Sequence, residues 1–402
     1  MSIKAYHQLG HASVWNLDSF IDEHCGEGVI LSPLHQARDK IKTLPEVVRR
    51  RALFDPQYYL PNSAKGKLAS YAFFPEQLSN GFSTRDFPPL ALDSAAQCVD
   101  FQLEHDFEGI VIPARFIDQM TPKYFDRQEE YTVVPFLKAL QKAQTDKPTY
   151  LTLPITSAML LDDDFRVQLL NWATSFPELN GVYVLVADDR NTKQIQSSEL
   201  IYAYLSFAHE LEVAGLSPVL GHLNTESVVL SAVDGATLTF GGYENTRIFS
   251  VDKFIESEEE RRSPKPRMYL PGLLNWIQYE QAIRVRSEEP DLWAKLYTPT
   301  MHADLVMAAP ADPHFSQPGL YKHSFVCMDA QLRSLGRLPI LERLAAIREA
   351  IKDAIDLYAT LEKAAFDFDR HGRGDHLQPW LDGLNRFYRQ VLRPQAPTWK
   401  DA

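Results

Sequence analysis

The chain has 402 residues, of which 45% are hydrophobic and 23% charged, a composition typical of a globular protein and not of a disordered one. Its formal net charge of −12 argues against a surface generally coated by nucleic acid, although a local basic groove stays open because docking depends on the local field. The three cysteines form neither a metal spacing nor a disulfide framework, which favours a reducing, cytoplasmic compartment. The N-terminus has no apolar signal-peptide core, and no apolar run approaches the roughly 20 residues of a membrane helix.

Short apolar runs that end in small or polar residues recur along the chain. They are typical of strands buried on both faces, and they cover 28–33, 52–56, 109–115, 149–154, 181–188, 217–222, 236–240 and, as an eighth, 267–271. Between them lie helical patterns at 94–104, 134–142, 165–174 and 198–213.

Strand, helix and strand in series predict parallel strands with right-handed crossovers. Seven or eight such strands predict an α/β fold, a closed (β/α)8 TIM-type barrel, over residues 1–274. An open doubly wound sheet is the alternative, weakened because no strand is followed by a glycine-rich dinucleotide fingerprint. Residues 275–402 are expected to form a C-terminal helical region packed on the barrel, with a long amphipathic helix over 340–366 and a shorter one over 380–392.

The run at 236–240 leads into a dense set of polar groups. Gly241 and Gly242 would let the backbone come close to a ligand, and Tyr243, Glu244, Asn245 and Arg247 follow at once. Because barrel enzymes place their chemistry at the C-terminal ends of strands, this segment is a candidate active site. Glu244 would supply a carboxylate, and Arg247 a ligand for a phosphate or a base edge; a surface ion pair is the structural alternative.

Other strand ends supply further candidates. Asp55 would lie at the barrel mouth as a general base or nucleophile, or else cap a turn. Asp188 could read the edge of a base or cap a helix, and His222 could donate to substrate or be a satisfied buried histidine. Arg115 could bind phosphate or pair with Asp118.

The long segment 62–89 and the residues before it interleave aromatic and basic groups. Tyr58, Tyr59, Tyr71, Phe73 and Phe74 could stack a flipped base, or anchor the loop to the barrel. Basic residues also gather at 49–51, 261–267 and 370–373 and would form a phosphate-binding surface if they shared a face.

Two of these strand ends resemble motifs of the tRNA-guanine transglycosylase superfamily, which includes relatives that act on DNA bases. Phe54-Asp55-Pro56-Gln57-Tyr58 occupies the place of the family's strand ending in Asp, which implies a catalytic Asp55 with Gln57 and Tyr58 near the substrate. Phe240-Gly-Gly-Tyr-Glu-Asn-Thr-Arg247 is in register with the family's Phe-Asp-Cys-Val-X-Pro-Thr-Arg at Phe240, Thr246 and Arg247.

This sequence departs from the family at two points. The family's nucleophilic aspartate falls on Gly241, and the nearest carboxylate is Glu244. The family's zinc motif is absent, since Cys327 and His323 alone are too few ligands, so we expect neither a metal nor another cofactor.

The resemblance implies cleavage or exchange of an N-glycosidic bond to a nucleobase in nucleic acid, with hydrolysis favoured by the loss of the nucleophile. DNA is favoured over tRNA, and modified bases in foreign DNA, in defence against phage, are one substrate class. The alternatives are a non-catalytic binding or scaffolding subunit and an unrelated barrel hydrolase acting on a small glycoside or phosphate ester. No membrane partner is expected, and homo-oligomers are left open.

Overall fold

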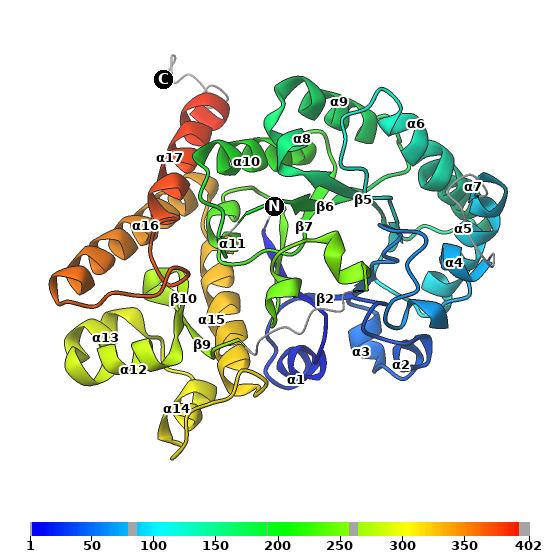
Figure 1. Cartoon of the computed structure of the whole chain (residues 1–402). Helices are drawn as coiled ribbons and strands as arrows, with labels where there is room; N and C mark the ends of the chain where they lie inside the picture. Colours follow the sequence, from blue (N-terminus) through cyan, green and yellow to red (C-terminus); the bar gives the residue numbers. More distant parts are fainter. Residues whose placement is uncertain (1, 79–86, 191, 257–263, 394–402) are drawn as a thin grey trace.

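The computed structural model describes residues 2–78, 87–190, 192–256 and 264–393. Eight parallel strands form one sheet in the order β3-β2-β1-β8-β7-β6-β5-β4, with helices around it (Figure 1). The strands are β1 Lys4–Gln8, β2 Gly28–Leu31, β3 Ala52–Phe54, β4 Ile110–Ile112, β5 Thr149–Thr156, β6 Gly181–Ala187, β7 Ser217–Leu220 and β8 Thr237–Phe240.

The sheet curls into a nearly closed barrel. At one junction β1 lies between β2 and β8, with Tyr6 opposite both Gly28 and Thr239. At the other, the backbone N–H of Glu108 donates to the carbonyl of Ala52 at 3.0 Å and brings the start of β4 to β3. The predicted (β/α)8 TIM-type barrel is therefore confirmed.

The predicted eighth strand was the wrong one. The run at 267–271 forms β9 (Arg267–Leu270), which pairs antiparallel with β10 (Asn275–Gln278) in a separate two-stranded sheet. The missing barrel strand is β1, whose polar residues hide it from a search for apolar runs. His7 and Gln8 of this strand are buried: His7 bonds the carbonyl of Cys25 at 3.0 Å, and Gln8 accepts from the Tyr183 hydroxyl at 3.1 Å, while Nε2 of Gln8 has no hydrogen-bond partner within the described residues.

Helices connect the barrel strands. The pattern at 198–213 is helix α10 (Ser198–Val213), and α5 (Phe87–Glu104) begins before the predicted 94. Within the described residues the remaining connections hold α1 Val14–Asp22, α2 Arg38–Lys42, α3 Glu46–Arg49, η1 Leu68–Ser70, α4 Pro75–Leu78, α6 Tyr124–Gln128, η2 Glu129–Val133, α7 Val134–Ala143, α8 Ser157–Leu161, α9 Asp163–Ala173 and α11 Ser227–Leu230.

The C-terminal part is helical around the β9–β10 hairpin and flanks the barrel (Figure 1). The long helix predicted over 340–366 is α16 (Ile340–Lys363). The other elements of the C-terminal part are η5 Pro271–Leu273, α12 Tyr279–Glu288, α13 Pro290–Leu296, α14 Met301–Ala308, α15 Gly319–Gly336, α17 Leu377–Phe387 and η6 Tyr388–Leu392. Between β8 and β9 lie two short helical turns, η3 Glu244–Thr246 and η4 Val251–Phe254. Within the described residues, no helix combines the length and apolarity that a membrane span needs.

Buried polar contacts hold this part to the barrel. Arg343 of α16 is 2% exposed, pairs with Asp234 at 2.8 Å and donates to the Ser231 carbonyl at 3.2 Å, just after α11. The indole of Trp380 in α17 donates to the Ile195 carbonyl at 2.9 Å, just before α10. The C-terminal helices are thus attached to the connections that follow β6 and β7.

We expect Arg343→Leu to lower the free energy of unfolding by about 2–4 kcal/mol, because it leaves buried carbonyls and Asp234 without their cation. Urea denaturation measures the change. Glu342→Ala, an exposed change on the same helix, is the control and should stay within about 0.5 kcal/mol. An equally stable Arg343→Leu variant would contradict this account.

Candidate functional site

The carboxyl ends of the barrel strands carry a set of buried ionisable groups whose charges act on one another. Asp55 directly follows β3, His222 follows β7, and Lys253 lies in η4 beyond β8. All three are therefore at the face where barrel enzymes hold their reactive groups.

Asp55 is fully buried and held on both carboxylate oxygens. Oδ1 accepts the backbone N–H of Gln57 at 3.0 Å, and Oδ2 accepts the hydroxyl of Tyr59 at 2.8 Å. Burial raises the pKa of Asp55 to about 6, while the Tyr59 hydrogen bond and the charge of Lys253 act in the opposite direction. A carboxylate with this pKa is ionised at neutral pH and still basic enough to accept a proton.

Lys253 is the charged neighbour of Asp55. Burial lowers its pKa to about 8, and the Asp55 carboxylate counteracts part of that shift. Its Nζ donates to Nε2 of His222 at 3.2 Å. Burial and the nearby Lys253 also lower the pKa of His222 and bring that of His35 to about 4, so both rings are neutral at neutral pH. Lys253 and His35 carry no signal in the sequence, because neither directly ends an apolar run.

Gln57 and Tyr58 support the site from inside the protein. Gln57 has a left-handed backbone with φ of 59° and accepts the N–H of Leu34 at 3.0 Å, which ties the end of β3 to the loop after β2. Tyr58 is fully buried, and its hydroxyl donates to the Phe73 carbonyl at 2.9 Å. With Tyr59, Tyr71, Phe73 and Phe74 also buried, these aromatics anchor the loop and cannot stack a base.

The double glycine serves an internal contact. A Cβ on Gly241 would lie 2.1 Å from Oγ1 of Thr246, and one on Gly10, after β1, would lie 2.3 Å from Cγ2 of the same residue. Thr246 is therefore wedged between the ends of β1 and β8, and its hydroxyl donates to the Tyr243 carbonyl at 2.6 Å. Gly241 admits the threonine, whereas a Cβ on Gly242 would have 3.6 Å of clearance.

An aromatic cluster lies beside this turn. It consists of His11, Trp15, Tyr243 and Tyr321, none of which is fully buried. The Tyr243 ring lies 5.8 Å from His11 and 5.2 Å from Tyr321, and Trp15 stacks on Tyr321 at 5.3 Å between centroids. His11 is also 6.4 Å from His35, which connects the cluster to the surroundings of Lys253. His11 and Trp15 follow β1, so both were missed with that strand.

A cationic cluster of Lys193, Arg247 and Arg267 forms a second charged region. Arg247 is 9% exposed and lies over the Trp276 ring at 4.0 Å, while its Nε and Nη1 have no hydrogen-bond partner within the described residues. Burial lowers the pKa of Arg247 to about 10. Burial, followed by the charges of Arg247 and Arg267, lowers that of Lys193 to about 8. Arg267 pairs with Asp369 and Lys193 with Glu244, so Nε and Nη1 of Arg247 are the donors of this cluster that suit an anionic ligand.

The other predicted side chains have partners of their own. Glu244 is half-exposed and pairs with Lys193. It is therefore not the second carboxylate of the Asp55 site, where the charged neighbour is Lys253. Asp188 lies 4.0 Å from Arg190, which bonds the buried Glu226 at 3.1 Å. Asn245 is half-buried in η3, and its Oδ1 has no partner within the described residues.

Arg115 is buried, with its guanidinium over the Tyr131 ring at 3.9 Å, and burial lowers its pKa to about 10. Its backbone is held by the side chain of Gln128. His323 bonds Thr300 at 2.8 Å and the Tyr269 carbonyl at 2.9 Å, a structural role. In the part of the chain that the structure describes, no group of three or more His, Cys, Asp or Glu is placed to hold a metal ion.

No family model, no curated protein and no solved structure matches the chain.

Of the predicted basic clusters, Arg261 and Arg262 lie outside the described residues.

Gly241→Ala should lower the free energy of unfolding by about 1–3 kcal/mol, because its Cβ overlaps Thr246. In a Thr246→Gly background, Gly241→Ala should cost less than it does in the wild type, because the overlapping side chain is gone. Thermal or urea denaturation of the wild type, the two single variants and the double variant measures this coupling. Gly242→Ala is the matched control and should cost less. Additive effects of the first two changes would refute the wedge.

The pKa of Asp55 predicts a pH-dependent stability difference. Because its folded pKa is raised from 3.8 to about 6, its favourable protonated form is lost as pH rises through about 6. Asp55→Asn should therefore become more stable relative to wild type between pH 4 and pH 7, by about 2–3 kcal/mol. Denaturation at both pH values measures this, with Asp22→Asn as an exposed control; a constant difference would exclude the shift.

Proposed function

We propose that this chain is an enzyme that hydrolyses the N-glycosidic bond to a nucleobase in nucleic acid, with DNA the favoured carrier. The observation that carries the proposal is the buried Asp55 carboxylate beside the Lys253 ammonium, at the face where barrel enzymes do chemistry. The resemblance of the segments around Asp55 and Arg247 to transglycosylase motifs supports the choice of bond. Modified bases in foreign DNA are the substrate class to test first.

The two groups have complementary tasks. As the C1′–N bond breaks, positive charge develops on the sugar, and the Asp55 carboxylate stabilises it. Water forms the new bond to C1′ and gives its proton to Asp55, while the Lys253 ammonium protonates the departing base. Proton transfer from Asp55 back to Lys253 then restores both charges. Their pKa values of about 6 and about 8 suit a base and an acid that act near neutral pH.

The surroundings supply the recognition that such a reaction needs. The aromatic cluster of His11, Trp15, Tyr243 and Tyr321 offers partly exposed rings on which an unstacked base can lie. Nε and Nη1 of Arg247, which have no partner among the residues that the structure describes, would donate to a phosphate oxygen. Glu244 is assigned to holding Lys193, and not to the sugar.

Gly241 favours a second candidate, a non-catalytic subunit that binds nucleic acid. Thr246 occupies the space that a side chain at Gly241 would need, so there is no room for the nucleophilic side chain that base exchange in the resembled family uses. The same observation argues for hydrolysis over exchange if the chain is catalytic.

Asp55→Asn should lower base release by about 100-fold or more, because the charge that stabilises the transition state is lost. Mass spectrometry of free base after incubation with a panel of modified and unmodified DNA and tRNA provides the measurement. An Asp55→Asn variant as active as wild type would refute the catalytic role. Binding without base release on the whole panel would favour the non-catalytic subunit.

The pH profile tests the pairing of the two groups. For wild type, kcat/KM should fall below pH 6 as Asp55 becomes protonated. Lys253→Met should lower the rate and move this acidic limb of the pH profile to a pH about one unit higher. The reason is that the Lys253 cation favours the ionised Asp55 carboxylate, and the variant lacks that cation. Lys253→Arg, which keeps the charge, should leave the limb in place. An unmoved limb in Lys253→Met would separate Lys253 from Asp55.

A further inference from the structure

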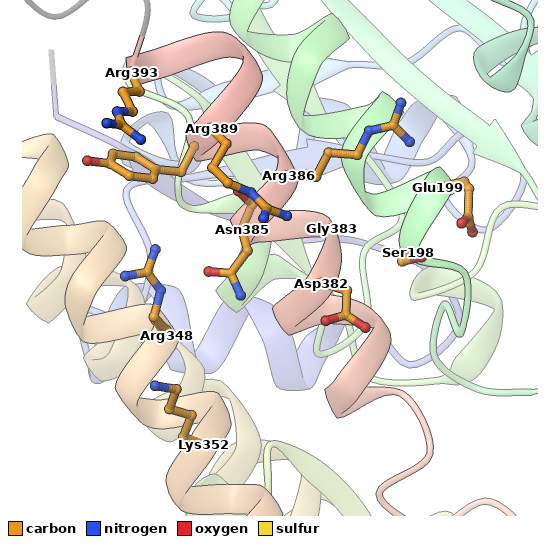
Figure 2. Close-up of a pocket in the computed structure, with 11 residues that line it drawn as sticks. Ser198, Glu199, Arg348, Lys352, Asp382, Gly383, Asn385, Arg386, Arg389 and Arg393 are labelled. Atoms are coloured by element: carbon orange, nitrogen blue, oxygen red, sulfur yellow. The ribbon is translucent and has the colours of Figure 1, made fainter.

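A basic groove lies between α10, α16 and α17, outside the site described above. It has a volume of about 780 Å³, and Figure 2 shows the side chains around it. Five cations line it against two carboxylates: Arg348, Lys352, Arg386, Arg389 and Arg393 face the same cavity as Glu199 and Asp382. This excess of positive charge contrasts with the net charge of −12 of the whole chain.

The five cations of the groove outnumber its two carboxylates, so the described residues of the lining do not neutralise them all. None of the five forms an ion pair with a carboxylate of the described residues, and four of them, Lys352, Arg386, Arg389 and Arg393, are exposed. Arg389 donates from Nε to the Asn385 carbonyl at 3.2 Å, a contact that orients the side chain without cancelling its charge. Closely spaced, unneutralised cations repel one another, and a polyanion relieves that repulsion.

The groove borders the face that carries Asp55. Ser198 and Glu199 begin α10, which follows β6, so this end of the helix lies on the side where the strands end. Gly383 of α17 packs on that first turn, where a Cβ would lie 2.8 Å from the Ser198 carbonyl oxygen. The Trp380 indole fixes α17 to the Ile195 carbonyl just before it.

The groove also contains an aromatic group. Tyr388 lines it, and the Arg348 guanidinium lies 5.8 Å from its ring centroid. Interleaved cations and an aromatic ring are the features with which proteins track a nucleic-acid backbone.

We propose that this groove binds the phosphodiester backbone of a nucleic acid and holds the strand whose base enters the barrel mouth. The inference rests on the proposed function, because it assigns the surface that would carry the polymeric substrate. The recognising chemistry is a run of phosphodiesters, which DNA and RNA share.

The test uses the full chain with Lys352, Arg389 and Arg393 changed together to Ala. Fluorescence anisotropy with labelled single-stranded DNA, duplex DNA and single-stranded RNA should show binding about tenfold or more weaker, with the salt dependence of log K reduced by about 2–3. Lys138→Ala with Lys142→Ala, two exposed cations of α7, is the matched control and should bind like wild type. The charge-preserving K352R/R389K/R393K variant should restore binding, which separates lost charge from lost folding.

The outcomes separate this inference from the proposed reaction. Equal binding by the triple alanine variant and wild type, or no binding of any probe by wild type, would overturn the inference. Preferential loss for DNA or for RNA would support it and identify the source of the phosphates. Groove-dependent binding by a wild type that releases no base would support the groove and count against the glycosidic reaction. If the triple variant releases base from a mononucleoside but no longer from a nucleic acid, both the groove and the glycosidic reaction would be supported.

Discussion

The pairing of β1 with both β2 and β8 is the constraint on which the rest of this structure depends. It joins the first strand of the barrel to the last, and so brings the end of β3, with Asp55, onto the same rim as the turn after β8. Thr246 completes this junction by filling the space beside Gly10 and Gly241. The aromatic cluster then forms around the junction, because His11 and Trp15 follow β1 while Tyr243 follows β8.

Burial gives the rim its chemical character. In water the carboxyl group of Asp55 and the ammonium group of Lys253 would have pKa values of 3.8 and 10.5, and in the folded protein these become about 6 and about 8. Each charge limits the shift that burial imposes on the other. A pair whose two pKa values bracket neutral pH can exchange a proton at little cost, which is the property on which the proposed hydrolysis relies.

The candidate site could be predicted in part because strand ends are visible in a sequence. Asp55, His222 and Arg247 each lie at or just beyond an apolar run, and all three are buried at the barrel face. Lys253 lies in η4 and His35 in a turn, and neither shows such a signal. The groove is even less visible, since its cations are separated from Glu199 by about 150 residues or more and share a surface only because Gly383 packs on α10.

The sequence by itself determined the barrel, because seven of its strands are apolar runs and α10 and α16 have clear helical periodicity. It also predicted that Asp55 would lie at the barrel mouth. Only the tertiary structure decided that β1, and not the run at 267–271, completes the sheet, since the buried His7 and Gln8 of β1 bond to distant partners, Cys25 and Tyr183. The tertiary structure also decided that Gly241 admits Thr246 and that the charges of Asp55 and Lys253 act on one another, because local periodicity does not relate these residues.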